Sequence, residues 1–289
     1  MIDLHLHSEC SDGTDSVEVL IDNLIDAGVK TFALSDHDTA VGCRQVFESE
    51  NLKQKIKDAE MTFIPAIEIS CVYKGRGVHI LAYDIDPFSK EIMQIEQGMR
   101  DLLKEKDVFR FKAIKDAGYE FSKKSQEFLS TRVNVRDADI ANCLVWDGYY
   151  ETVRSAMRDF TMQIKYPKKY MFDAVEVLKL FSKTNAKLVW AHSIHGLCQK
   201  PLSFEQIEEW IVEFKQYGLC GLECYYSLYS KDEIDKLLEL AKKHNLYITC
   251  GSDYHGKNKE VKILERTADG SDVDESKIDI IEKFENIVN

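Results

Sequence analysis

The chain has 289 residues, of which 44% are hydrophobic, so it can bury a full-sized core and form one barrel domain of alternating strands and helices. Its formal net charge of −12 argues against a broad phosphate-tracking surface like that of non-specific nucleic-acid binders, although bound metals can still attract an anionic substrate. There is no apolar window long enough for a membrane span, no signal-peptide pattern at the N-terminus and no CxxC pair among the eight cysteines. We therefore expect a cytoplasmic protein with free thiols and no membrane partner.

Residues 1–90 alternate between short apolar strands and amphipathic helices, which is typical of a parallel α/β fold. The expected strands cover residues 2–5, 31–34, 62–67 and 78–82. A helix over residues 16–27 joins the first two strands, and Gly28 suits its C-terminal cap.

Residues 91–171 break this rhythm, because they are charged, helical in pattern and without a convincing strand. The rhythm returns afterwards, with strands expected over residues 187–191, 218–224 and 246–251 and helices over 231–244 and 278–288. We therefore expect a barrel domain over residues 1–90 and 172–289 and a helical insertion domain over 91–171.

His5 and His7 are two residues apart on the first strand, so both imidazoles project from one face of the sheet. Such a pair alone is equally compatible with a structural role. The later strands, however, also lead to potential metal ligands: Asp36, His37 and Asp38; Glu68; His79; His192; Glu223; and Asp253 with His255. Because the carboxyl ends of barrel strands meet on one face, six of the eight histidines are expected at one site.

Several of these residues also have other interpretations. Asp38 precedes an expected helix start and is better explained as an N-cap, and Asp36 is a candidate to orient a ligating imidazole. Glu223 lies on an apolar strand, where an unpaired carboxylate would be costly, which favours a role in the site. His244 follows two lysines at a helix C-terminus and is assigned a structural role, whereas His195 suits either role.

The sequence resembles the PHP superfamily, named for its polymerase and histidinol phosphatase members, and within it the stand-alone bacterial phosphoesterases. The matching stretches are Asp3 to Ser8, Ser11 to Thr14, Ser35 to Thr39, Glu68 to Ser70, His79, Ala191-His192 and Gly251 to Gly256. The resemblance implies a distorted (β/α)7 barrel that holds up to three divalent metal ions. It implies a first metal held by His5, His7, Glu68 and Asp253, a second held by bridging Glu68, His79 and His192, and a third held by Asp12, His37 and His255.

The ligand set that the resemblance implies favours a phosphoester substrate, because three dications would leave the pocket positive after three carboxylates are counted. We expect a metal-activated water to attack phosphorus in line, with no covalent enzyme intermediate. The catalytic set would then be His5, His7, Glu68, His79, His192, Asp253 and His255. Imidazole and carboxylate ligands suit manganese, iron or zinc equally.

The sequence departs from the family pattern in the insertion, where the related enzymes carry a basic stretch that contributes to the substrate pocket. The best match here runs from Asp137 to Asn142, in which the basic positions are acidic or neutral. Candidate phosphate contacts are Arg132 and Arg136, for which solvated surface positions are an equal alternative, and Arg76, Lys74 and Lys257.

Three functions remain open at this point. The first is a phosphoesterase acting on a small phosphate ester or a nucleotide such as a 3',5'-nucleoside bisphosphate. The second is a 5'-3' exonuclease on short RNA or DNA, for which Tyr225, Tyr226 and Tyr229 would have to stack bases rather than pack in the barrel. The third is a non-catalytic, metal-binding regulatory protein, whose mark would be a missing ligand, and none is missing. The substrate, the native metal and the oligomeric state do not follow from the sequence.

Overall fold

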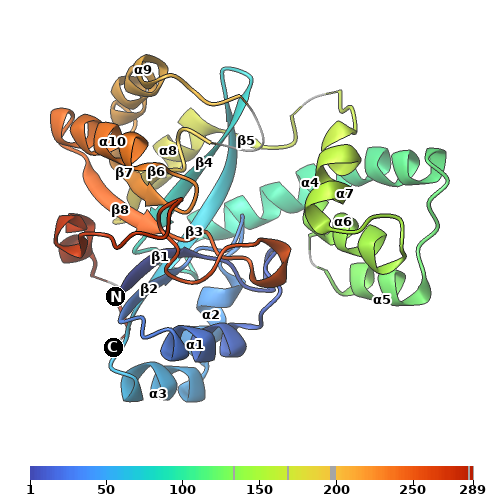
Figure 1. Ribbon diagram of the computed structural model, residues 1–289, viewed down its shortest axis with the longest axis horizontal. Coiled ribbons are helices and arrows are strands. Elements are labelled where there is room, and N and C mark those ends of the chain that lie inside the picture. Colours follow the sequence, from blue (N-terminus) through green and yellow to red (C-terminus); the bar gives the residue numbers. More distant parts are fainter. Residues whose placement is uncertain (133, 168, 196–199, 286, 289) are drawn as a thin grey trace.

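The computed structural model describes residues 1–132, 134–167, 169–195, 200–285 and 287–288 (Figure 1). The strands are β1 (Ile2–Leu6), β2 (Thr31–Leu34), β3 (Thr62–Tyr73), β4 (Arg76–Tyr83), β5 (Phe172–Asp173), β6 (Lys187–Ala191), β7 (Leu219–Tyr226) and β8 (Tyr247–Gly251). The helices are α1 (Val17–Asp26), α2 (Val41–Glu48), α3 (Glu50–Asp58), α4 (Lys90–Asp116), α5 (Lys123–Thr131), α6 (Asp137–Trp146), α7 (Val153–Asp159), α8 (Ala174–Phe181), α9 (Phe204–Lys215) and α10 (Lys231–Lys243).

The eight strands form one sheet that curls into a nearly closed barrel. Its order is β1-β2-β3-β4-β6-β7-β8, and the two-residue strand β5, which sequence analysis missed, pairs with β3. The two ends of the sheet meet just beyond β8, where the His7 amide donates to the Tyr254 carbonyl at 3.0 Å and the Asp253 amide donates to the His5 carbonyl at 2.9 Å. The distorted seven-stranded barrel expected from the sequence is thus confirmed.

The direction of β4 differs from the prediction of a parallel sheet, since β4 runs antiparallel to both β3 and β6. The two residues between β3 and β4, Lys74 and Gly75, both have positive φ angles, of 46° and 78°. This geometry is typical of a tight hairpin, which leaves no room for a helical crossover. The start of β4, with His79, therefore lies beside the far end of β3, and His79 pairs with Ser70 and Ala191.

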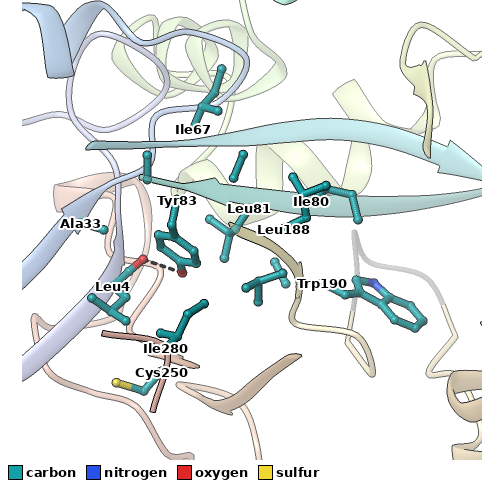
Figure 2. Packing of buried hydrophobic residues seen from close by; sticks show 14 of the residues in the cluster. Leu4, Ala33, Ile67, Ile80, Leu81, Tyr83, Leu188, Trp190, Cys250 and Ile280 are labelled. Atoms are coloured by element: carbon teal, nitrogen blue, oxygen red, sulfur yellow. Dashed lines mark hydrogen bonds between the residues drawn. The ribbon is translucent and has the colours of Figure 1, made fainter. Parts of the chain in front are cut away.

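The barrel interior is filled by apolar side chains from strands that are far apart in the sequence (Figure 2). Tyr83 of β4 is fully buried, and its hydroxyl donates to the Leu4 carbonyl of β1 at 2.9 Å, so its one polar atom is satisfied inside the core. Outside the sheet, α1 begins after Ser16, whose side chain accepts from the Val19 amide, and it ends before Gly28, which has a φ of 74°. This helix and its glycine cap agree with the sequence prediction.

Helices α4 to α7 begin at Lys90 and fill most of residues 91–171, and they project from one side of the barrel (Figure 1). The described residues of this segment contain no strand, as predicted. A small apolar cluster, separate from the barrel core, joins α4, α6 and α7 and is formed by the buried residues Ile114, Ile140, Ala141, Leu144 and Ala156. Among the residues that the structure describes, no helix has the length and apolar character needed to cross a membrane.

The prediction of a C-terminal helix over residues 278–288 is wrong. A short 3-10 helix covers Asp279–Lys283, and Val288 forms an antiparallel bridge with Phe63 of β3. The Phe63 amide donates to the Val288 carbonyl at 2.8 Å, and the reverse hydrogen bond is 3.0 Å long. Pairing with the strand requires an extended backbone, which overrides the helical spacing of the apolar residues.

Candidate metal centre

Strand β1 places His5 and His7 on the inner side of the barrel mouth, where both side chains are fully buried. Nε2 of each imidazole lies 3.2 Å from Oε2 of Glu68, which comes from β3. Oδ1 of Asp253, just after β8, lies 3.5 Å from Nε2 of His5 and 3.2 Å from Nε2 of His7. Three strands therefore bring the four predicted ligands of the first metal together, with one donor atom of each within 4.8 Å of the others.

The other oxygen of Glu68 faces a second group of histidines. Its Oε1 lies 2.7 Å from Nδ1 of His79 and 3.0 Å from Nε2 of His192, and these two nitrogens are 3.2 Å apart. His37, which was predicted only for the third metal, also has a donor atom within 4.8 Å of Glu68 and His79, and its Nδ1 lies 3.1 Å from Oε2 of Glu68, the oxygen that also faces His5 and His7. Glu68 is thus placed between the first and second groups, as a bridging carboxylate would be.

A third group forms where the loops after β1, β2 and β8 meet. His255 Nε2 lies 3.3 Å from Oδ1 of Asp12, and His7 Nδ1 lies 3.9 Å from the same oxygen. Donor atoms of His7, Asp12, His37 and His255 all lie within 4.8 Å of one another. Gly13 is required beside Asp12, because a Cβ on this residue would lie 2.5 Å from the His7 carbonyl oxygen.

These groups fit divalent metal ions because their donor atoms face one another without being paired. Six buried donor atoms make no hydrogen bond with any described residue: Nε2 of His5, both ring nitrogens of His7, Oδ1 of Asp12, Nδ1 of His37 and Oε2 of Glu68. Burying so many unpaired polar atoms would be costly without a ligand that they share. Imidazole nitrogens with carboxylate oxygens are the donors that manganese, iron and zinc accept.

The charges of the centre also favour a cation. Burial opposes ionisation of Glu68, but the surrounding imidazoles hold the pKa of that carboxyl well below its usual range. Burial likewise opposes a charged His7, yet Asp253 and Glu68 raise the pKa of that imidazole to about 9. Burial lowers the pKa of His37 well below its ordinary value, which keeps its ring neutral. The carboxylates thus create a field that attracts positive charge, and a metal ion can replace the proton on His7.

The backbone at two of these positions is conformationally unusual. His192 has a φ of 29° and Asp253 a φ of 57°, values that residues with a Cβ seldom adopt. Strained backbone of this kind persists where surrounding structure enforces it, and it gathers at functional sites.

Comparison with known proteins identifies the family. The PHP domain model matches residues 3–217. The chain belongs to the PHP domain family. It is 27% identical over 259 residues to the 5'-3' exoribonuclease of Haemophilus influenzae, covering 88% of this chain and 89% of that protein. It is 23% identical over 257 residues to the 3',5'-nucleoside bisphosphate phosphatase of Chromobacterium violaceum, covering 88% and 87%.

The fold of this PHP protein is shared with a crystal structure from Bifidobacterium adolescentis, of a protein proposed to be a metal-dependent phosphoesterase. The TM-score is 0.78 at 23% sequence identity, and the match covers 99% of this chain and 96% of the other.

Glu223 supports the PHP centre from outside the predicted ligand set. Its Oε1 lies 2.9 Å from Nδ1 of His5, and its Oε2 accepts from the His192 backbone amide at 2.7 Å. This contact directs Nε2 of His5 toward Glu68 and Asp253, as outer carboxylates commonly do for ligating histidines. The cost of an unpaired buried carboxylate was the sequence signal for this residue.

Asp36 and Asp38 have roles that sequence analysis did not predict. Among the described residues Asp36 contacts no imidazole; it accepts from the Ser8 amide at 2.8 Å and from the Ser11 hydroxyl at 2.6 Å, and so fixes the loop that leads to Asp12. Asp38 is not an N-cap, because α2 begins at Val41 after Ala40. Its carboxylate instead accepts from the amide and hydroxyl of Ser70, which ties the end of β2 to β3.

A cavity of about 790 Å³ opens beside the PHP centre, between the barrel and the helices of residues 91–171. Asp12, His37 and His79 line its barrel side. The opposite side carries basic and aromatic residues together with methionines: Lys106, Arg110, Arg136, Arg158, Lys169, Tyr166, Tyr170, Met99, Met157, Met162 and Met171. A volume of this size suits a small-molecule or nucleotide ligand.

Of the basic residues predicted to contact phosphate, Arg136 lines this cavity, and the others lie outside its lining. Arg76 donates to the Lys200 carbonyl at 2.6 Å, Lys74 pairs with Glu209 at 2.9 Å, and Lys257 is exposed. Lys106 and Arg110 were missed, because on the sequence they are two of many charged positions along α4.

Asp137 does not leave the insertion acidic at this point, since it pairs with Lys106 at 2.8 Å and with Arg110 at 2.8 Å. Lys259 was also missed; its Nζ contacts the Asp253 carboxylate and lies 3.1 Å from the Tyr226 hydroxyl. Nothing in the sequence distinguishes it from neighbouring Lys257.

The tyrosines at the end of β7 and just after it are packing residues. Tyr225, Tyr226 and Tyr229 are all buried, with exposed fractions of 5%, 4% and 0%, so none offers a face on which a base could stack. His195 pairs with Glu233 at 2.9 Å, away from the centre, and His244 pairs with Glu208 at 2.7 Å.

Proposed function

We propose that this PHP protein is a phosphoester hydrolase whose nine predicted ligands hold up to three divalent metal ions, with manganese, iron and zinc as the candidates. The observation that carries the proposal is the convergence of unpaired, buried imidazole and carboxylate atoms from strands spread over the whole barrel. His5, His7, Glu68 and Asp253 would hold the first ion, and Glu68 would be shared with the second.

The second ion would also be held by His79 and His192, and the third by Asp12, His37 and His255. Divalent cations bound there would supply Lewis-acid stabilisation of the phosphoryl oxygens and lower the pKa of an attacking water. The catalytic residues are then His5, His7, Glu68, His79, His192, Asp253 and His255.

The chain's own residues prepare this centre before substrate binds. Glu223 fixes His5 in one ring orientation, and the Asp253 carbonyl oxygen, 2.9 Å from Nδ1 of His255, leaves Nε2 of that ring facing Asp12. Because these side chains are held by buried partners, little reorganisation is needed when charge develops at phosphorus.

The cavity supports a nucleotide as the substrate class. Arg136 and Lys106 supply cationic groups for phosphate oxygens, while Tyr166 with the methionines supplies an apolar wall for a base. A 3',5'-nucleoside bisphosphate combines both features. Residues 91–171 are proposed on this basis as an insertion domain that forms the outer wall of the site.

A second candidate is 5'-3' exoribonuclease activity, which the 27% identity to the Haemophilus influenzae enzyme favours. Both activities hydrolyse a phosphoester. The exoribonuclease substrate would be an RNA chain that extends out of the cavity, whereas a nucleotide would fit inside it. A non-catalytic metal-binding protein is the weakest alternative, because all nine ligand positions are filled and gathered at one mouth.

The proposal is tested by metal analysis of the purified protein together with hydrolysis assays after reconstitution with manganese, iron or zinc. The substrates are phosphate monoesters, nucleoside bisphosphates and short RNA carrying a 5'-phosphate. Two to three bound metals with turnover of one class support the enzyme and separate the nucleotidase from the exonuclease. A protein that binds no metal and turns over none of the substrates would overturn it.

The base-binding wall is tested separately with Tyr166→Ala. Loss of a stacking partner costs about 1–3 kcal/mol, so the Michaelis constant for a nucleoside bisphosphate should rise while that for a monoester without a base stays the same. Phe111→Ala is the control, because Phe111 is 44% exposed on α4 and lies outside the cavity lining. Equal effects on both substrates would argue against a base at Tyr166.

A further inference from the structure

Three side chains of the helical segment, residues 91–171, contact the loops that carry Asp12, His37 and His255. Arg132, the C-cap of α5, donates to the Glu9 carbonyl at 2.6 Å and also to the Ser11 carbonyl, in the loop that ends at Asp12. Its guanidinium is held in turn by Asp139 of α6, with Nε 3.1 Å from the carboxylate. Arg132 thus donates its hydrogen bonds to backbone carbonyls near the predicted ligand Asp12, and it does not line the cavity.

The second contact is made by Arg136, the residue before α6. Its guanidinium donates to the His37 carbonyl at 2.8 Å and to the Asp38 carboxylate at 2.6 Å. The Asp38 carboxylate also accepts from Ser70, so Arg136 joins α6 to the ends of both β2 and β3. Arg136 therefore adds a contact from the helical side to the backbone of His37, which also forms a parallel β-bridge with Glu68 of β3.

The third contact passes through Asn258. Asn142 of α6 donates to the Asn258 side-chain oxygen at 2.8 Å, and the Asn258 side-chain amide donates to the Asp12 carbonyl at 2.6 Å. The backbone amide of Asn258 donates to the His255 carbonyl at 3.3 Å. This partly buried amide pair links α6 to the loops that carry Asp12 and His255.

Three of the other ligands lie within strands, whereas His7, His192 and Asp253 lie one or two residues after a strand ends. His5 lies within β1, Glu68 within β3 and His79 within β4, and their backbones belong to the hydrogen-bonded sheet. Asp12, His37 and His255 lie outside the named strands, and each of their loops receives a hydrogen bond that starts from α5 or α6. The Asp137 to Asn142 stretch that replaces the basic family pattern supplies two of the participants, Asp139 and Asn142.

We infer that Arg132, Arg136 and Asn142 are positioning residues that assemble the third metal site from the helical segment, so that residues 91–171 control how many metals the centre holds. The inference rests on the proposed function, because it requires that Asp12, His37 and His255 bind a metal. Residues of this outer layer commonly change metal affinity by about 10–100-fold when they are replaced.

The test uses Arg132→Gln and Asn142→Ala, since Arg136 also lines the cavity and its loss would affect substrate as well. Each variant is equilibrated at a free Mn²⁺ concentration that just saturates wild type, and bound metal is counted by mass spectrometry. We expect two metals in place of three, with the missing one restored at about 10–100-fold higher Mn²⁺. Activity should recover with it at an unchanged Michaelis constant, and Arg132→Lys should restore part of the affinity.

Two controls separate positioning from general damage. Arg154→Gln removes an exposed arginine from α7 in the same helical segment and should leave all three metals bound. Arg132→Gln with Asp139→Asn removes the carboxylate that the single variant leaves without its arginine partner, and it should lose the same metal. Full metal content in Arg132→Gln and Asn142→Ala, or a raised Michaelis constant that excess Mn²⁺ does not correct, would overturn the inference alone. A wild-type protein that never binds a third metal would overturn it together with the trinuclear part of the proposed function.

Discussion

Replacing Glu223 by glutamine tests whether the metal centre depends on a carboxylate that is not itself a predicted ligand. Glu223 is fully buried and receives two donors, Nδ1 of His5 at 2.9 Å and the His192 amide at 2.7 Å. Glutamine keeps one acceptor oxygen but turns an NH2 group toward the other donor. One charge-assisted hydrogen bond is therefore lost, at a cost of about 1.5–3 kcal/mol.

Because 1.4 kcal/mol corresponds to a factor of ten, this loss predicts metal binding at the first site that is weaker by about 10–100-fold. Isothermal titration of the metal-free protein with Mn²⁺ or Zn²⁺ measures the change directly. The control is Glu239→Gln, which removes an exposed carboxylate from α10 and should leave affinity unaltered. Wild-type affinity in a folded Glu223→Gln protein would refute the idea that Glu223 orients His5.

Three further predictions address the ligands, the packing and a buried acid. Asp253→Ala should remove metal and activity together while circular dichroism still reports a folded barrel, and full activity without metal would contradict the mechanism. Gly251→Ala places a Cβ 2.1 Å from Cβ of His5, so it should lower the melting temperature and weaken metal binding, because overpacking typically costs about 1–3 kcal/mol. An unchanged melting temperature would contradict this close approach of β8 to β1. Burial raises the pKa of Asp139 to about 6 in spite of Arg132, so the folded protein binds this proton more tightly than the unfolded chain does. Relative to Asp139→Asn, the unfolding free energy of wild type should therefore fall by roughly 3 kcal/mol as the pH rises from about 4 to about 6. Above that range the difference in unfolding free energy between the two proteins, measured by urea denaturation at each pH, should stay constant.

The sequence is sufficient for the ligands that sit on strands, because strand geometry is local. Residues two positions apart on a strand project from the same face of the sheet, so His5 and His7 could be paired without knowledge of the fold. Glu68, His192 and Asp253 follow from the rule that strand ends meet at one mouth of a barrel. That rule fails for His79, which reaches the mouth from the start of an antiparallel strand.

The residues that could not be predicted take their roles from contacts between distant segments. Asp36 was expected to meet an imidazole, yet its partners are Ser8 and Ser11, and no local pattern states which loop lies beside the end of β2. Arg110 is buried against Asp137 because α4 packs on α6 in one particular register. Charge patterning along a helix shows that both residues are polar, but it does not show that they meet.

The difference between strand-borne and loop-borne ligands has an energetic consequence. Moving Glu68 would break the backbone ladder between β3 and β4, whereas moving Asp12 would break loop contacts, among them those of Arg132, Asn258 and Asp36. Each such hydrogen bond contributes about 0.5–1.5 kcal/mol net. Dilution of metal should therefore empty the third group while the Glu68-bridged pair stays filled, and stepwise dialysis with metal counting would show a plateau at two. A single loss of all metals at once would mean that the three groups bind as one cooperative unit, and that the helical segment stabilises the whole mouth of the barrel.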